Sequence, residues 1–304
     1  MNNRKPLDLT ACLSIVLLCS LWGGQQVLFK LTIHDIHPNM QIALRSAIGC
    51  ILLAAFMWHK GVSLALWRGP WRAGTMVGSL FALEWWMIGE ALQYTSASHV
   101  VVFLYTAPIF TALGLHIWRP DERLNWWQWI GVLICFSGIG LAFLGSSSAT
   151  QLDPQTLLGD CLALGGGVLW AATTVVTRCS GLARIPATQT TMYQLLIGAL
   201  VILLLCLVLG ETEIHWSPFL VASVVGQGLV ISFFSLLVWI WLLRHYLASR
   251  VSIFTFIAPL IGVGLSVWLL DEPLHSEFVW GAVMVMAGMI LVNLAPQTRR
   301  LNGA

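Results

Sequence analysis

The stretch ASHVVVFLYTAP at residues 97–108 returns as ASRVSIFTFIAP at residues 248–259. Six of the twelve aligned positions are identical, and Pro108 matches Pro259. After a one-residue gap, DERLNWWQWIGVLICFSGIGL at 121–141 aligns with DEPLHSEFVWGAVMVMAGMIL further along the chain. Two copies of one pattern in the same order predict an internal duplication of the whole chain.

The composition is that of a protein whose solvent is lipid. Of 304 residues, 58% are hydrophobic and 9% are charged, whereas a soluble domain carries about 25% charged residues. A spanning helix needs roughly 20 apolar residues, so a chain of this length has room for about ten. The apolar windows predict helices at about 9–29, 39–58, 73–92, 98–118, 126–145, 156–177, 188–209, 219–242, 250–270 and 278–295.

The duplication and the helix count together predict the domains. Residues 1–145 form a first five-helix repeat and residues 156–296 a second one, separated by a polar linker at 146–155 and followed by a tail at 297–304. Because five is an odd number, the second repeat enters the membrane in the opposite orientation.

The basic residues predict the orientation. Thirteen of the fifteen Lys and Arg residues lie in the terminal segments or in alternate loops, on one side of the predicted helices. These are Arg4, Lys5, Lys60, Arg68, Arg72, Arg119, Arg123, Arg178, Arg184, Arg244, Arg250, Arg299 and Arg300. The positive-inside rule then places both termini in the cytoplasm and the 146–155 linker in the periplasm of a bacterial inner membrane.

The charge bias also reverses between the repeats. Arg119 and Arg123 lie in the loop before the fifth helix, whereas the matching loop at 271–275 has no Lys or Arg. One pattern with opposite charge bias is what inverted repeats require. The predicted fold class is therefore an all-α polytopic membrane protein of ten transmembrane helices in two inverted five-helix repeats.

Several fragments carry a family resemblance. In the first half these are LWGGQQVLFK, ALRSAIGCILL, EALQYTSAS and APIFTAL, and the second half has LWAATTVVTR, HYLASRV and APLIGVGL in the same order. The chain resembles the drug/metabolite transporter superfamily and, within it, the EamA-type exporters with ten helices. The resemblance implies carriage of a small metabolite, such as an amino acid, a related amphipathic solute or a drug, with export as the direction. It names no single cargo.

Candidate substrate contacts are aromatic or polar side chains inside the predicted helices. Trp22 and Trp170 occupy matching positions, and each is followed by two small residues. Such rings either fill the helix bundle or hold an amphipathic or cationic solute by stacking. The full candidate set is Trp22, Gln25, Gln26, Arg45, Glu84, Trp85, Tyr105, Trp170, Thr174, Tyr193 and Gln227.

Arg45 and Glu84 are the most informative members of this set. An ionised side chain at the bilayer centre costs around 2.5 to 3.5 kcal/mol on insertion scales, so each needs a partner or a hydrated cavity. The two residues lie at similar predicted depths, which allows an ion pair between them. An arginine at the Arg45 position is common in the resembling family. Both a structural pair and a site for substrate or a proton remain open.

Prolines and glycines mark two further features. Pro108 and Pro259 lie mid-helix at equivalent positions, where each removes a hydrogen bond and predicts a kink. The bend is either static or a pair of hinges, one for each half. Gly131 and Gly138, like Gly281 and Gly288, are seven residues apart, which predicts close helix packing on one face.

Other functional classes find little support in the sequence. The basic residues form no stripe for nucleic acid, the cysteines and histidines form no metal pattern, and no cofactor motif is present. Without a G-x-x-x-x-G-K-[ST] loop, a carrier would depend on a proton gradient or on an exchanged solute. An integral-membrane enzyme and a non-transporting scaffold are the rival interpretations, and monomer and homodimer are both open. The histidines fall at helix ends and are interpreted as interfacial.

Overall fold

The computed structural model describes residues 8–66, 69–120, 123–144, 147–148, 151–246 and 257–294. The first half contains α1 (Leu9–Leu31), α2 (Pro38–His59), α3 (Trp71–Tyr94), α4 (Ala97–Leu104), α5 (Ala107–Trp118) and α6 (Trp126–Leu144). The second half contains α7 (Pro154–Cys179), α8 (Ala187–Leu209), α9 (Pro218–Gly226), the π-helical η4 (Gln227–Phe234), α10 (Ser235–His245), α12 (Ile257–Leu270) and α13 (Ser276–Leu294). A 3-10 turn, η3 (Gly181–Arg184), and a two-residue hairpin, β1 (Ser147–Ser148) with β2 (Gln151–Leu152), complete the described elements.

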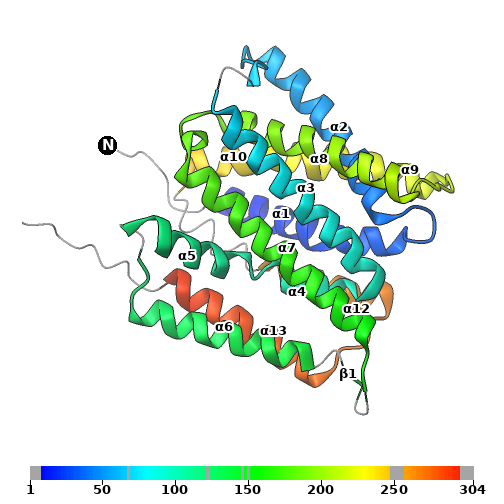
Figure 1. The fold of residues 1–304 in the computed structure, drawn as a ribbon, viewed down its shortest axis with the longest axis vertical. Coiled ribbons are helices and arrows are strands. Elements are labelled where there is room, and N and C mark those ends of the chain that lie inside the picture. Colours follow the sequence, from blue (N-terminus) through cyan, green and yellow to red (C-terminus); the bar gives the residue numbers. More distant parts are fainter. Residues whose placement is uncertain are drawn as a thin grey trace, which may run out of the picture.

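These elements form ten membrane-crossing segments, because α4 continues into α5 and α9 continues through η4 into α10 (Figure 1). Six segments of the described chain are long and apolar enough to span a bilayer, and α6, α12 and α13 are shorter apolar helices. The remaining segment, α3, is 24 residues long and carries three charged side chains. The predicted fold class is confirmed.

The helix starts follow local capping chemistry. The Asp8 carboxylate accepts a 2.8 Å hydrogen bond from the amide of Ala11 at the start of α1, and the Ser217 hydroxyl accepts one from Leu220 at the start of α9. Proline occupies the first turn of α2, α7 and α9, where its missing amide hydrogen costs nothing. Polar caps or prolines therefore mark the start of these helices.

The two halves pack through matching helices. The last helices of the halves, α6 and α13, run side by side (Figure 1), and α2 packs on α8. A Cβ atom added to Gly138 would lie 2.7 Å from the carbonyl oxygen of Gly281, and one added to Gly281 would lie 2.7 Å from that of Gly138. Glycine thus permits the close backbone approach that the sequence predicted.

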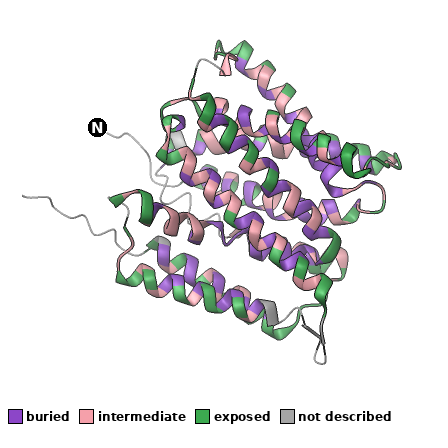
Figure 2. Ribbon diagram, in the orientation of Figure 1, coloured by how far each residue is buried: buried purple, intermediate pink, exposed green. Residues whose placement is uncertain are grey.

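The apolar exterior fits a lipid environment. Trp268 is 73% exposed and Val208 is 73% exposed, and Figure 2 shows exposed residues along the outward faces of the helices with buried ones between them. Large exposed apolar surfaces on a soluble protein would be a liability, whereas in a bilayer they are the contact surface.

The helices alternate in direction, so the bundle has two ends. We call the end that carries the 146–155 linker the linker end; it also holds the α3–α4 turn and the α12–α13 turn. We call the opposite end, which holds Arg119, Arg123, Arg178 and Arg184, the arginine end.

The fourth segment breaks at its centre. Helix α4 ends at Leu104 and α5 begins at Ala107, so Tyr105 and Thr106 separate them, with Pro108 in the first turn of α5. Pro108 thus ends one helix and starts the next, a sharper interruption than a kink. Pro259 lies in the first turn of α12, and because residues 247–256 lie outside the described residues, the kink predicted at Pro259 stays a prediction.

Candidate functional site

A cavity of about 740 Å³ lies between the two halves. Nine of the predicted residues line it, namely Trp22, Gln25, Arg45, Glu84, Trp85, Tyr105, Pro108, Trp170 and Thr174. They come from α1, α2, α3, the α4–α5 segment and α7, so both halves contribute. The volume falls within the range of about 300 to 1,000 Å³ that is usual for small-molecule sites.

Arg45 is held in a defined position within this cavity. Arg45 is 3% exposed, and its Nη1 atom donates a 2.7 Å hydrogen bond to Gln25 Oε1. The guanidinium carbon lies 4.0 Å from the ring centroid of Trp85 and 5.0 Å from that of Phe29. The Nε atom has no hydrogen-bond partner among the described residues. The guanidinium group of Arg45 is therefore held in place, and its Nε atom is an unused hydrogen-bond donor.

Glu84 shares the cavity without contacting Arg45 directly. The residue is 4% exposed and lines the same space, but no nitrogen–oxygen pair within 4.0 Å joins Arg45 and Glu84 in the described structure. The ion pair that the sequence allowed is thus not formed here, because Gln25 and two aromatic rings hold the guanidinium. The cavity presents the two opposite charges separately.

Aromatic rings line the cavity on both sides. Trp22 packs edge-on against Trp239 with a centroid distance of 5.4 Å, and its indole nitrogen donates a 3.1 Å hydrogen bond to Ser235 Oγ. Tyr105 packs edge-on against Trp170 at 5.6 Å. These contacts fix the ring planes that a solute would meet.

The cavity reaches the surface at the arginine end. Arg123, Arg178 and Gln128 line it there, and both arginines are exposed. In the sequence, these arginines are recognisable only as topology signals, and Gln128 carries no distinguishing signal. Only the packing of the helices shows that these three residues lie at the cavity.

Polar contacts join the two halves at the linker end. Asp160 of α7 is fully buried; it accepts a 2.6 Å hydrogen bond from the Thr95 hydroxyl and lies 3.0 Å from His99 Nδ1. His99 is 8% exposed. His99 lies in the first turn of α4, at a helix end as the sequence predicted, and its ring packs parallel to that of Phe278 at 4.0 Å.

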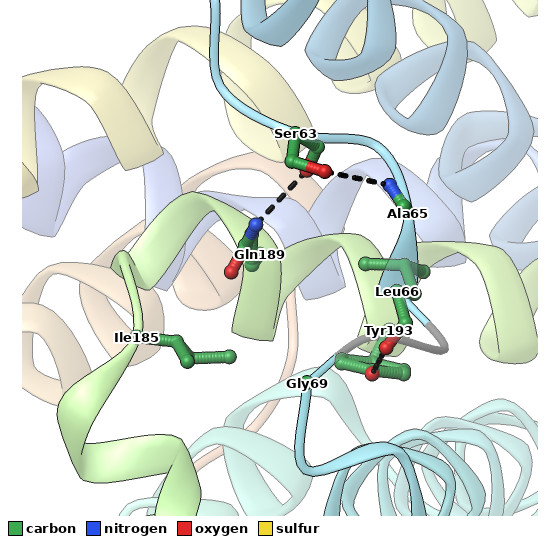
Figure 3. A pocket seen from close by; sticks show the side chains of 7 residues that line it. All are labelled: Ser63, Ala65, Leu66, Gly69, Ile185, Gln189 and Tyr193. Carbon is green, nitrogen blue, oxygen red and sulfur yellow. Dashed lines mark hydrogen bonds between the residues drawn. The ribbon is translucent and has the colours of Figure 1, made fainter.

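Three of the predicted substrate contacts, Tyr193, Gln26 and Gln227, do not line the cavity. Tyr193 instead faces a separate pocket of about 220 Å³ beside the α2–α3 connection (Figure 3), where its hydroxyl donates a 2.5 Å hydrogen bond to the carbonyl of Leu66. Gln26 is fully buried, and neither of its polar side-chain atoms has a hydrogen-bond partner among the described residues.

Gln227 belongs to a chain of polar contacts nearer the linker end. Its Nε2 atom donates to Ser223 Oγ at 3.2 Å, and Ser223 Oγ also accepts from Gln41 Nε2 at 3.0 Å. The Oε1 atom of Gln41 in turn accepts from Thr32 at 2.7 Å. Gln41 and Ser223 therefore link the two halves, and Gln227 bonds to Ser223 while its Oε1 atom has no hydrogen-bond partner among the described residues.

One group of described residues has donor atoms close enough for a metal ion. His37, Glu90 and Glu211 present ligand atoms within 4.8 Å of one another at the linker end. His37 Nδ1 lies 3.2 Å from Glu211 Oε2. Burial lowers the pKa of His37, and the neighbouring Glu211 opposes that effect. A direct contact between the His37 and Glu211 side chains accounts for this geometry, and all three residues are partly exposed.

Comparison with known proteins places the chain among transporters. Residues 9–144 and 157–294 match the EamA-like transporter family. The uncharacterized transporter YoaV of Bacillus subtilis is 23% identical over 281 residues, covering 92% of this chain and 95% of that protein. A probable amino-acid metabolite efflux pump of Escherichia coli K12 is 24% identical over 284 residues, covering 91% and 92%.

A solved crystal structure of another protein has the same fold. It superposes with a TM-score of 0.66 at 19% identity, covering 93% of this chain and 97% of that one. The family match covers each five-helix half separately, in agreement with the ten membrane-crossing segments. The chain belongs to the EamA-like transporter family, within the drug/metabolite transporter superfamily, and is a multi-pass membrane transporter.

Proposed function

We propose that the protein is a secondary carrier of the bacterial inner membrane that exports an amphipathic amino acid or a related solute by alternating access. The observation that supports this most is the cavity between the halves, whose lining includes exposed residues at the arginine end and none from the turns at the linker end. A cavity at the repeat interface, open to one side, is the arrangement of one state in such a cycle.

The charges in the cavity favour a zwitterionic solute. The Arg45 guanidinium, whose residue lines the cavity, would bind a carboxylate, and Glu84 offers an acceptor to an amine or to a proton. The rings of Trp22, Tyr105 and Trp170 supply an apolar wall for a side chain. Arg123 and Arg178 at the mouth would attract a carboxylate from the cytoplasm.

The two halves are proposed to move as bodies. Residues 1–145 and 156–296 would rock against each other around the cavity, with Pro108 and Pro259 as paired hinges and the 146–155 linker in the periplasm. The 297–304 tail would lie in the cytoplasm. Energy would come from a proton gradient or from an exchanged solute.

A carrier is favoured over an enzyme by the contents of the cavity. Among its described lining residues, Glu84 is the one carboxylate, and no His or Cys accompanies it. A catalytic site needs a nucleophile, an acid or base, and a stabilising group at one depth. A cavity of rings, amides and separated charges is suited to binding.

Flux in liposomes tests the proposal. Purified protein is reconstituted in vesicles loaded with labelled leucine, phenylalanine, threonine or glutamate, and efflux is followed with and without a pH gradient. We expect one or more apolar amino acids to leave faster than from protein-free vesicles, and Trp22→Ala to abolish the difference. Trp268→Ala, at a residue that is 73% exposed on the outside of the bundle, is the matched control. Equal efflux from wild-type and protein-free vesicles for all four would contradict an amino-acid carrier.

A further inference from the structure

We propose that Glu272 and Asp160 act as two latches that hold the linker end of the transporter closed. Both belong to the second half and both bind the α3–α4 turn of the first half. The proposal rests on alternating access, and it assigns the closure of one end to named carboxylates.

The first latch binds the start of α4. Glu272 lies between α12 and α13, and its Oε1 atom accepts a 2.7 Å hydrogen bond from the amide of Ala97. Its Oε2 atom accepts a 3.0 Å bond from the amide of Ser98 and a further short bond from the Ser98 hydroxyl. The carboxylate therefore binds two amides that have no partner within the helix, and it lies at the positive end of the α4 dipole. Charge-assisted bonds of this type are the strong ones.

The second latch binds the residues on either side of that contact. Asp160 of α7 accepts from the Thr95 hydroxyl at 2.6 Å, and its two oxygens each lie 3.0 Å from His99 Nδ1. Gly159 allows this approach, because a Cβ there would lie 2.9 Å from the backbone nitrogen of Thr95. The two carboxylates thus grip one turn, Thr95–His99, from two different elements of the opposite half.

A third contact supports the same turn from within the first half. Lys30 at the end of α1 donates from Nζ to the carbonyl of Leu92 at 2.6 Å and to that of Thr95 at 2.9 Å. These carbonyls end α3 and have no partner further along the helix. The ammonium group caps the C-terminal end of α3 and stabilises the turn. A movement of the turn would therefore strain the contacts of Glu272 and Asp160 together.

The latched turn leads directly to the break in the fourth segment. Helix α4 runs from Ala97 to Leu104 and is followed by Tyr105, which lines the cavity. Every residue of α4 is buried. A path from the cavity to the linker end requires α4 or α7 to move, and neither can move away from the other half while Glu272 and Asp160 hold their partners.

The alternative is that these contacts are permanent and stabilise the fold in every state. Hydrogen–deuterium exchange of the full-length protein in lipid nanodiscs separates the two, with Glu272→Gln and Asp160→Asn as test variants. A lost bond alone would speed exchange at Ala97 and Ser98. An opened end would also speed exchange in the first turns of α7 and the last turn of α3, by roughly tenfold. It would slow exchange at the closing arginine end, within residues 174–195.

Two controls are matched to these variants. Glu277→Gln makes the same change five residues further on, at an exposed side chain bonded to its neighbour Ser276. Tyr246→Phe removes a bond between halves at the opposite end, where the hydroxyl donates to Asp8 at 2.8 Å. We expect neither to speed exchange at the linker end.

The outcomes divide cleanly. Faster exchange at the linker end with slower exchange within residues 174–195 supports the latches. Unchanged exchange beyond Ala97 and Ser98, or faster exchange throughout α6 and α13 as well, overturns them in favour of a static structural role. The measurement needs no solute, so a failure of the flux assay would contradict the proposed cargo without altering this result.

Discussion

The guanidinium of Arg45 lies 4.0 Å from the ring centroid of Trp85, in a residue that is 3% exposed. The contact keeps the guanidinium over the ring, while Gln25 accepts a bond from one of its nitrogens. Stacking of this kind on a desolvated ring is worth about 2 kcal/mol or more. Arg45 is therefore positioned as a planar group, which a lysine could not reproduce.

Replacing Arg45 by lysine should weaken solute binding while keeping the charge. The ammonium group loses the planar stack and the fork of donors, so we expect the KM for efflux to rise roughly tenfold. Arg72→Lys is the control, because Arg72 also lies over a tryptophan, 5.5 Å from the ring centroid of Trp71, on an exposed part of α3. Equal KM values for wild type and Arg45→Lys would contradict a role for the planar group.

Glu84 can be tested for coupling by a double substitution. If Glu84 carries a proton or binds an amine, Glu84→Gln should abolish efflux driven by a pH gradient while the protein remains folded. If the two charges only balance each other, Glu84→Gln should lower the folded yield, and adding Arg45→Gln should restore it. Recovery of both yield and gradient-driven efflux in the double variant would remove both residues from the transport cycle.

The number and order of the helices could be predicted because both depend on local rules. A helix in lipid satisfies its own backbone, so apolar length determines each span. The window at 156–177 became α7 at Pro154–Cys179, with Asp153 and Pro154 extending its start. The duplication of Pro108 and of the glycines that follow it then predicted the two halves, since proline fixes its own φ and glycine permits close helix packing in any surroundings.

The rotation of each helix about its axis could not be predicted in the same way. Tyr193 and Gln194 are neighbours in α8, and successive side chains point about 100° apart. Gln194 lines the cavity, whereas the Tyr193 ring packs where a Cβ on Gly74 would be. The α8 sequence is apolar on nearly every side, so no polar face distinguished the two. The contact of His99 with Asp160 was missed for a similar reason, because it joins two helices from different halves.

The packing of α6 on α13 should depend on glycine at the contact. Gly281→Ala would place a Cβ 2.5 Å from the backbone nitrogen of Ala142, and overpacking of this kind costs about 1 to 3 kcal/mol. Gly140→Ala is the control, since no atom lies within 4 Å of its added Cβ, and alanine favours a helix by about 1 kcal/mol over glycine. We expect thermal unfolding in detergent to give a lower Tm for Gly281→Ala and an equal or higher Tm for Gly140→Ala. Equal Tm values for wild type and Gly281→Ala would show that the two helices can separate without cost.

The orientation in the membrane is predicted by the loop charges. Alkaline phosphatase fused after Ser148 should be active and the same enzyme fused after Arg300 inactive, because the first lies in the linker and the second in the basic tail. Green fluorescent protein at the same two positions should give the opposite pattern. An inactive phosphatase after Ser148 together with an active one after Arg300 would invert the topology, and the cavity would then open to the periplasm.

Pro108 should matter for turnover more than for stability. The helix is interrupted at Tyr105 and Thr106, and the Thr106 carbonyl accepts a bond from Ile109 as α5 begins. Replacing Pro108 by alanine restores an amide hydrogen and removes the ring that clashes with the carbonyl of Leu104. An alanine would therefore allow α4 and α5 to join, which stiffens the segment that lines the cavity.

We expect Pro108→Ala to keep wild-type yield and Tm while the rate of efflux falls several-fold with little change in KM. Pro218→Ala is the control, because Pro218 begins α9 in the first turn, where no bend is present. Wild-type turnover in Pro108→Ala would mean that the interruption is a fixed feature of the bundle and that the halves move about another point.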